Sequence, residues 1–363
     1  MTSRASSSLD RARAACRHSV SVELAGARVS FSSDSAHGVR IVRTIFGPYC
    51  DLGPPEHDGW RVLSARVRDL ERLIPDGPPP KPVRRWAGDF PAERYDIAPG
   101  RSVVVHSQPF VGLTLFDRDE RELVYLRPGA AYEVPHTEHV VKYPLRVALR
   151  RAGFAQVHAA ACSFEGRGLL LLGPRRSGKS TLLFRLMSRG ARFVASDMSF
   201  VRERRMIAFP HMLRIGAGTI GDNEELSAFF ARHERTDDYL RSPIFNAGKE
   251  ELYFPLLAKI WGDVCRDTPL DAVVFPALDL ARSTSEILPV PAEETRRRVR
   301  ETLVDDPPTL DWLPFMADEE FEALTRSLAE DVASSVPGGY ELRFGARETD
   351  PVAALKARSF APC

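Results

Sequence analysis

Residues 173–180 read GPRRSGKS and follow the pattern G-x-x-x-x-G-K-[ST]. Four leucines, residues 169–172, stand directly before this segment, and residues 180–190 after it have the apolar spacing of a helix that ends at Gly190. A glycine-rich turn between a buried strand and a helix lets successive backbone N–H groups point at phosphate oxygens. The helix N-terminus adds a partial positive charge. The pattern therefore predicts a phosphate-binding loop.

The residue types in this loop predict separate roles in binding ATP and Mg²⁺. Lys179 is expected to reach the β- and γ-phosphates, and the Ser180 hydroxyl to ligate Mg²⁺. Arg175 and Arg176 either add positive charge near the phosphates or are solvated. The predicted nucleotide-binding set is Gly173, Ser177, Gly178, Lys179, Ser180 and Thr181, the last of which either contacts the nucleotide or simply begins the helix.

The type of phosphate-loop protein is narrowed by motifs that the sequence lacks and by one carboxylate. There is no N-K-x-D for guanine recognition and no L-S-G-G-Q of a transporter ATPase, which argues against both classes. Asp197 follows a strand-like run at residues 192–195. A carboxylate there can hold Mg²⁺ or accept a proton from an attacking hydroxyl. The alternative is that Asp197 caps the next element.

Residues 158–197 resemble the catalytic core of the HPr kinase/phosphorylase family and its relatives in peptide-biosynthesis clusters. The resemblance depends on His158, fifteen residues before Gly173, on the loop itself, and on R-G-x-R-x-x-x-x-D from Arg189 to Asp197. It implies an α/β phosphate-loop kinase core like that of HPr kinase and phosphoenolpyruvate carboxykinase, rather than a doubly wound sheet. It further implies that the γ-phosphoryl group of ATP passes to a serine hydroxyl of a peptide or protein.

The resemblance also implies a catalytic set of Asp197, His158 and Lys179, with Ser180 and Asp197 as metal ligands. His158 matches the family's histidine near the active site, although a strand histidine satisfied by the core is an equal alternative. The family has two adjacent aspartates where this chain has Ser196 and Asp197. Either Asp197 covers both roles, or another carboxylate substitutes, or the chemistry is weak. A small-metabolite kinase and a nucleotide-binding regulatory protein with decayed kinase activity are therefore alternatives.

Three further groups of residues carry weaker signals. Arg214 and Lys249 either contact phosphates or the acceptor, or are ordinary surface charges. His136, Glu138 and His139 have the composition of a metal site, but they fall in a predicted turn with no fourth ligand and are expected to be solvated.

The overall composition bounds the class of protein. Of the 363 residues 44% are hydrophobic and 27% charged, and the net charge of +1 gives no reason to expect a nucleic-acid or membrane partner. No apolar run approaches the ~20 residues of a membrane span. Five scattered cysteines without CxxC spacing argue against a disulfide framework or zinc site, and predict a cytoplasmic protein.

Alternating apolar residues predict two short strands around Gly26, and helical spacing predicts helices at residues 223–234 and 292–303. Together such patterns predict a mixed α/β chain in three parts. Residues 1–20, rich in Arg and Ser, are expected to form a disordered leader. Residues 21–150 are expected to form an α+β recognition or assembly region, closed by a helix that starts at Pro144. Residues 151–363 are the predicted kinase domain. A homo-oligomer is left open.

Overall fold

The computed structural model describes residues 3–56, 58–75, 79–85, 90–106, 111–129, 133–232, 249–303, 313–345 and 350–357. The chain is mixed α/β, with strands in several sheets, and it divides into two compact units. Residues 3–152 and 313–323 belong to the first unit, and 153–303 and 324–357 to the second. No helix in the described ranges is long and apolar enough to cross a membrane.

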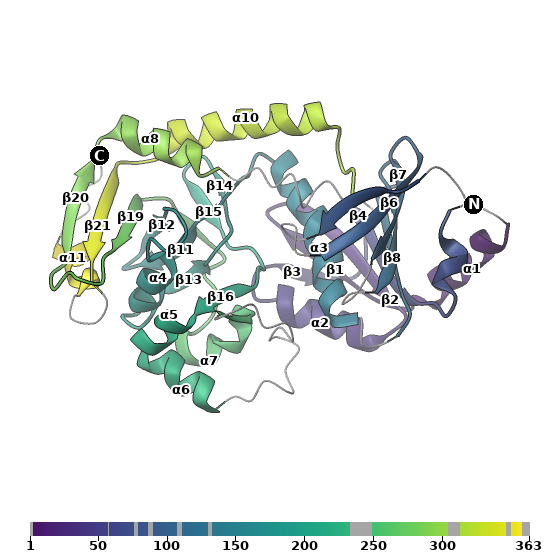
Figure 1. The fold of residues 1–363 in the computed structure, drawn as a ribbon, viewed down its shortest axis with the longest axis horizontal. Coiled ribbons are helices and arrows are strands. Elements are labelled where there is room, and N and C mark those ends of the chain that lie inside the picture. Colours follow the sequence, from purple (N-terminus) through teal and green to yellow (C-terminus); the bar gives the residue numbers. More distant parts are fainter. Residues whose placement is uncertain are drawn as a thin grey trace. The chain divides into compact units, whose positions relative to one another are not determined.

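The first unit is built on one nine-stranded sheet in the order β3-β1-β2-β4-β9-β8-β7-β6-β5 (Figure 1). The neighbours β2–β4 and β4–β9 are parallel, and the other pairs are antiparallel. The hairpin predicted around Gly26 is present, and this glycine has the positive φ of 82° that such a turn favours. The strands are β1 (His18–Leu24), β2 (Ala27–Ser33), β3 (Asp51–Gly53), β4 (Trp60–Arg66), β5 (Lys81–Arg85), β6 (Phe90–Ala98), β7 (Arg101–His106), β8 (Gly112–Asp117) and β9 (Glu122–Arg127).

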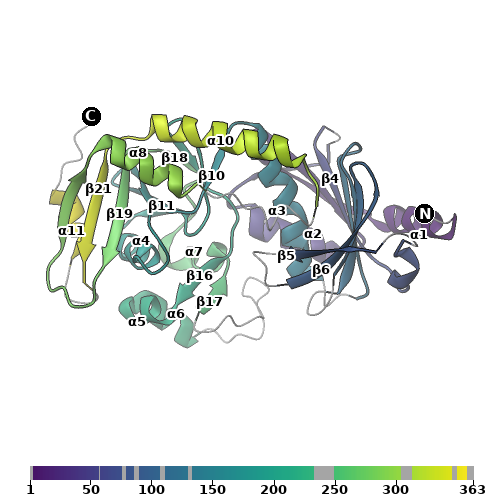
Figure 2. The ribbon, with the colours of Figure 1, turned by 45° about the horizontal axis from the view of Figure 1, so that its top comes forward.

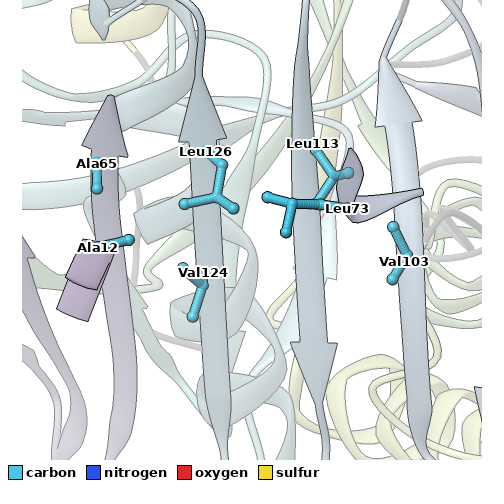
Figure 3. Packing of buried hydrophobic residues seen from close by; sticks show 7 residues of the cluster. All are labelled: Ala12, Ala65, Leu73, Val103, Leu113, Val124 and Leu126. Atoms are coloured by element: carbon cyan, nitrogen blue, oxygen red, sulfur yellow. The ribbon is translucent and has the colours of Figure 1, made fainter. Parts of the chain in front are cut away.

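Helices cover both faces of this sheet. The helices α2 (Ala36–Phe46) and α3 (Glu133–Arg151) lie on one face, and α1 (Ser3–Ala15) lies on the other, in both Figure 1 and Figure 2. The face under α1 is lined by every second residue of the strands, because successive side chains of a strand point to opposite faces. Buried apolar residues on this face form a hydrophobic cluster, shown in Figure 3, which consists of Ala12, Ala65, Leu73, Val103, Leu113, Val124 and Leu126.

The predicted disordered leader is not what the structure shows. Residues 3–15 form α1, and its Ala12 is buried in the cluster just described, with Leu9 packed against it. The Arg and Ser content predicted a solvated tail. However, Leu9 and Ala12 are three residues apart and therefore lie on one face of the helix. Burial of that face against the sheet stabilises the helix.

The predicted turn at residues 136–139 and the predicted helix start at Pro144 are also wrong. Both positions lie inside α3. Glu138 is buried, with its carboxylate oxygens 2.6 Å from Lys142 Nζ and 2.9 Å from His139 Nε2. Burial alone would raise the pKa of Glu138, but the charges of His139 and Lys142 lower it below its usual range. This group is therefore a buried ion pair at helical spacing; the His136 side chain lies outside the described part of the chain.

The second unit is built around a six-stranded sheet in the order β13-β11-β12-β19-β21-β20. Its centre, β12–β19–β21, is parallel, and the outer pairs are antiparallel. A four-stranded sheet, β10-β14-β15-β18, and a two-stranded ribbon, β16-β17, complete the unit. The strands are β10 (Ala155–Val157), β11 (Ala160–Phe164), β12 (Arg167–Leu171), β13 (Arg192–Ala195), β14 (Ser199–Arg202), β15 (Arg205–Ile207), β16 (Leu213–Gly216), β17 (Lys249–Leu252), β18 (Asp267–Pro269), β19 (Ala272–Leu278), β20 (Glu286–Val290) and β21 (Gly339–Phe344).

Helices flank these strands at the predicted positions and elsewhere. The predicted helices after the 173–180 segment, after Asn223 and after Pro291 are present as α4, α6 and α8. The helical elements are α4 (Lys179–Met187), α5 (Ala217–Asp222), α6 (Glu224–Arg232), α7 (Ala258–Trp261), α8 (Ala292–Glu301), α10 (Asp318–Ser335) and α11 (Pro351–Ala357), with single 3₁₀ turns η1 (Leu70–Leu73) in the first unit and η3 (Phe254–Leu256) in the second. The division between the units falls inside α10.

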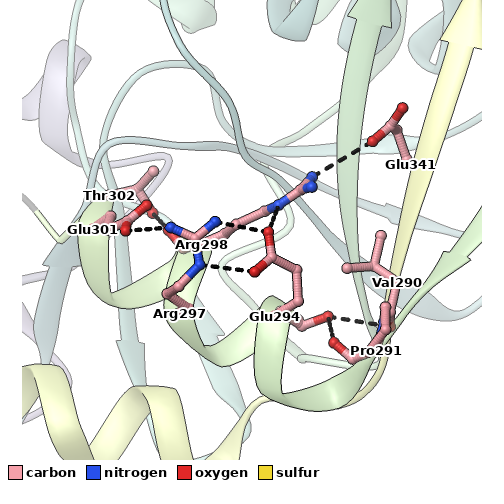
Figure 4. Close-up of polar contacts among 9 residues, drawn as sticks. Val290, Pro291, Glu294, Arg297, Arg298, Glu301, Thr302 and Glu341 are labelled. Carbon is pink, nitrogen blue, oxygen red and sulfur yellow. Dashed lines mark hydrogen bonds and ion pairs between the residues drawn. The ribbon is translucent and has the colours of Figure 1, made fainter.

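The charged face of α8 is tied to its own turns and to the sheet (Figure 4). Glu294 accepts hydrogen bonds from Arg297 and Arg298, and Arg298 Nη1 also lies 3.6 Å from Glu341 Oε2 on β21. The Thr295 hydroxyl donates to the Pro291 carbonyl at 3.1 Å. A Cβ at Gly339 would lie 2.5 Å from Thr295 Oγ1, so the glycine permits close packing of α8 on β21.

The division into units agrees closely with the predicted end of the first region but assigns one later segment differently. The division after Ala152 lies two residues beyond the predicted end of the first region, at 150. However, residues 313–323 were expected in the kinase domain and belong instead to the first unit. The ring of Phe315 packs edge-on against Trp60 and Phe116, each at a centroid distance of 4.9 Å. No local pattern indicates this return, because the contact joins residues about 200 to 250 positions apart.

Candidate functional site

Strand register brings three predicted site segments to one edge of the six-stranded sheet. Because β11 and β12 are antiparallel with Ala160 opposite Leu171, the chain just before β11 meets the chain just after β12. Because β11 and β13 are antiparallel with Ala161 opposite Ala195, the chain just after β13 meets the same place. His158, the 173–180 loop and Asp197 therefore converge, although up to 39 residues separate them.

The 173–180 loop is held by the ends of two parallel strands. The Ser177 carbonyl accepts a hydrogen bond of 3.0 Å from the Leu278 N–H at the end of β19. Gly178 has φ 96°, and a Cβ on it would lie 2.8 Å from Leu278 Cβ and 2.9 Å from Phe344 Cζ. Only glycine fits both this conformation and this space. A Cβ at Gly173 would likewise lie 2.7 Å from Ser177 Oγ.

The side chains of the loop residues differ in what they contact. Ser177 Oγ is buried and has no hydrogen-bond partner in the described ranges. Ser180, at the second position of α4, is partly exposed. Thr181 is not only a helix starter, because its Oγ1 lies 3.0 Å from Thr219 Oγ1 on α5. The side chains of Arg175 and Arg176 are exposed, and Arg176 has the positive φ of 67° that is uncommon for a non-glycine residue.

Lys179 folds its ammonium group back onto the loop. Its Nζ donates to the carbonyls of Gly173 at 2.6 Å and Pro174 at 3.1 Å. The residue is only 8% exposed. Burial lowers the pKa of Lys179, the charge of Asp197 opposes that shift, and the charge of Lys249 adds to it. A buried ammonium on two neutral carbonyls is a cation without a full counter-charge at hydrogen-bond distance.

His158 and Asp197 face one another, with Nε2 3.4 Å from Oδ1. Both side chains are partly exposed. Burial is the largest influence on the His158 imidazole and lowers its pKa, whereas Asp197 acts in the opposite direction. Nearby cations lower the pKa of His158 further: these are Lys179, Arg175 and Arg214. The lowered pKa favours the neutral ring, in which one nitrogen can accept a proton.

The two residues with weaker sequence signals, Arg214 and Lys249, both lie on the β16–β17 ribbon. Arg214 pairs in register with Glu251, and its Nε lies 3.1 Å from Glu251 Oε1. Lys249 is exposed at the other end of the ribbon, opposite Gly216. Their charges act on His158 and Lys179 respectively.

The sequence analysis did not identify the residues that hold α4, the helix after the loop, in place. Arg185 on α4 binds Asp222 on α5 through two contacts, Nε–Oδ2 at 2.8 Å and Nη2–Oδ1 at 2.9 Å. A third nitrogen donates to the Gly345 carbonyl just after β21. No pattern in the sequence indicates the distant partners of Arg185.

No described group of three or more His, Cys, Asp or Glu side chains is arranged to hold a metal ion. Mg²⁺ in kinases usually takes one or two carboxylates, with water and substrate phosphates as its other ligands. Among the predicted site residues, Asp197 and Ser180 have side-chain oxygens that could bind Mg²⁺. Comparison with models of known protein families gives no match, and comparison with curated proteins gives none either.

Proposed function

We propose that this protein is an ATP- and Mg²⁺-dependent kinase that transfers the γ-phosphoryl group to a hydroxyl. The acceptor class, a serine of a peptide or protein, is taken from the resemblance of residues 158–197 to HPr kinase-like enzymes. The observation that supports the proposal most is the convergence of the 173–180 loop, His158 and Asp197 at one sheet edge.

The donors in the loop fit an anionic ligand. Among the described residues the Lys179 ammonium donates to two neutral carbonyls, and the buried Ser177 hydroxyl has no partner there; phosphate oxygens would satisfy both groups better. Gly178 caps the N-terminus of α4 without a side-chain hydrogen bond, so the N–H groups of the first turn and the helix dipole favour an anion there. Phosphoryl transfer depends mainly on such positioning and charge stabilisation.

The pair His158–Asp197 fits the acceptor side of the reaction. Asp197 can orient or deprotonate a hydroxyl, and the neutral imidazole of His158 can accept or share that proton. Ser180 and Asp197 would hold Mg²⁺, which would supply positive charge against the phosphates. These roles follow from the residue types and from their placement at one edge of the sheet.

The proposal is tested by two substitutions measured with labelled ATP, Mg²⁺ and candidate peptide and metabolite acceptors. We expect Lys179→Ala to abolish ATP binding because the only lysine of the loop is removed. We expect Asp197→Asn to keep ATP binding but to reduce phosphoryl transfer by at least about 100-fold, as is typical for loss of a general base.

The control is Lys259→Ala, which removes an exposed lysine of the same unit. Unchanged ATP affinity in Lys179→Ala would refute the loop assignment. Normal turnover in Asp197→Asn would refute the role of that carboxylate.

A second candidate function is a regulatory protein that binds ATP without transferring phosphate. Ser196 favours it, because the resembling family has an aspartate at this position. This candidate predicts ATP binding that Lys179→Ala removes, with no transfer to any peptide or metabolite acceptor.

A further inference from the structure

The β16–β17 ribbon is positioned beside the first turn of α4. β16 ends at Gly216 and leads directly into α5, which contacts both β16 and α4. Thr219 of α5 lies 3.0 Å from Thr181, measured between the hydroxyl oxygens. Thr219 is only three residues beyond Gly216, and Gly216 pairs with Lys249. The end of the ribbon formed by Gly216 and Lys249 therefore lies near Thr181, at the start of α4.

The ribbon brings two cations to this place, and they differ in how they are neutralised. The guanidinium of Arg214 is paired with Glu251, whose side chain is only 9% exposed. The ammonium of Lys249 pairs with no carboxylate among the described residues. The described residues thus provide a carboxylate for Arg214 and none for Lys249.

A nucleotide whose phosphoryl group is to be transferred creates a charge problem at this edge. Its terminal phosphate must lie near the group that activates the acceptor, and that group includes the carboxylate of Asp197. Two anions at short distance repel one another. In the proposed function Lys179, the loop amides and Mg²⁺ offset part of this negative charge, and further cations near Asp197 would lower the repulsion that remains.

We propose that Arg214 and Lys249 bind the terminal phosphate of the nucleotide, so that the β16–β17 ribbon distinguishes a nucleoside triphosphate from a diphosphate. In the absence of that phosphate Glu251 neutralises Arg214; when it is bound, Arg214 exchanges the carboxylate for phosphate oxygens. The inference rests on the proposed function, because it assumes that the 173–180 loop holds the remaining phosphates.

The test compares the dissociation constants for ATP and ADP, each with Mg²⁺, by calorimetry on the full chain. In Arg214→Gln we expect the affinity for ATP to fall by about tenfold or more and that for ADP by less than about twofold, because a charge-assisted contact to the terminal phosphate is lost. Lys249→Gln is expected to change the same ratio by a smaller factor. The matched control is Arg205→Gln, an exposed arginine of β15 that pairs with Asp267.

Glu251→Gln separates direct contact from support of the ribbon. It removes the partner of Arg214 but keeps the guanidinium, so the preference for ATP over ADP should persist or increase. Loss of the preference in Glu251→Gln would overturn the proposal, because Arg214 would then act only through the structure of the ribbon. Equal weakening of ATP and ADP in Arg214→Gln, or a wild-type protein with no preference for ATP, would also overturn it.

Failure of the proposed function has a different signature. A wild-type protein that binds neither nucleotide would overturn both the loop assignment and this inference. Binding of both nucleotides that depends on Lys179 but not on Arg214 or Lys249 would leave the loop assignment intact and overturn this inference alone.

Discussion

At the scale of single residues, the candidate site depends on His158 remaining uncharged. Its pKa is lowered mainly by burial and then by the cations of the site, although Asp197 lies 3.4 Å away and acts in the opposite direction. A neutral ring beside a carboxylate is a proton acceptor, whereas a protonated ring would form an ion pair with Asp197 and occupy it. The electrostatic surroundings of His158 are therefore as important as its position.

The lowered pKa of His158 predicts a stability that depends on pH. The unfolded chain binds a proton at His158 near pH 6.5, the usual value, and the folded chain does so only at lower pH. Stability from this group is therefore present above about pH 6.5 and decreases as the pH falls below it. Melting temperatures between pH 7.5 and 5.5 should decrease more for the wild type than for His158→Asn.

The control for this measurement is His18→Asn, since His18 is exposed at the start of β1. It should follow the wild type. An identical pH dependence in the wild type and His158→Asn would show that burial does not shift the titration of His158.

At the scale of elements, the site is made where strand ends meet. The antiparallel partners of β11 bring the chain before it, the loop after β12 and the turn after β13 together, and the parallel ends of β19 and β21 support the loop through Leu278 and Phe344. The helices α4 and α5 then fix the loop from the other side through Arg185 and Thr181. Each element contributes one position and none forms the site alone.

The contact of Arg185 with Asp222 predicts a measurable cost when it is removed. The two side chains are 13% and 10% exposed. Arg185→Gln leaves the carboxylate of Asp222 largely buried without its guanidinium, so the free energy of unfolding in urea should fall by about 3 kcal/mol. The double variant Arg185→Gln/Asp222→Asn should recover part of this loss because no unpaired charge is left.

An exposed pair of the same type provides the contrast. Arg297 on α8 pairs with Glu294 in solvent, and Arg297→Gln should change stability little. A loss in Arg185→Gln no larger than that in Arg297→Gln would contradict the bracing role of Arg185.

At the scale of the whole molecule, the chain divides into two compact units, and the first is completed by a segment from late in the sequence. Phe315 is 2% exposed and packs against Trp60 and Phe116 of the first unit's sheet. The first unit is therefore incomplete if the chain is cut after residue 152.

This division predicts a selective effect of Phe315→Ala. Removal of a buried ring should destabilise the first unit by about 3 kcal/mol. Hydrogen exchange should accelerate in β4 and β8 but not in β12 or β19, and nucleotide binding should persist. Phe315→Leu, which keeps much of the volume, is the control and should show a smaller acceleration; equal acceleration in both units would contradict the division.

Local patterns predicted those features that local physics controls. The glycine spacing with four leucines before it and a helical stripe after it predicted the strand, loop and helix at residues 169–187, because backbone conformation and periodicity are encoded within a few residues. The same applies to the hairpin at Gly26 and the helix at residues 292–301. The patterns failed where composition opposed packing, as in α1, and where a proline lies inside α3.

The sequence by itself determined the local order of strand, glycine-rich loop and helix at residues 169–187 and the residue types that the proposed function uses. Only the tertiary structure decided which of them meet. The distance between His158 and Asp197, the bracing of α4 by Asp222, the placement of Arg214 and Lys249, and the return of Phe315 to the first unit all depend on strand register and long-range packing. Such contacts join residues dozens to hundreds of positions apart, and no local pattern specifies them.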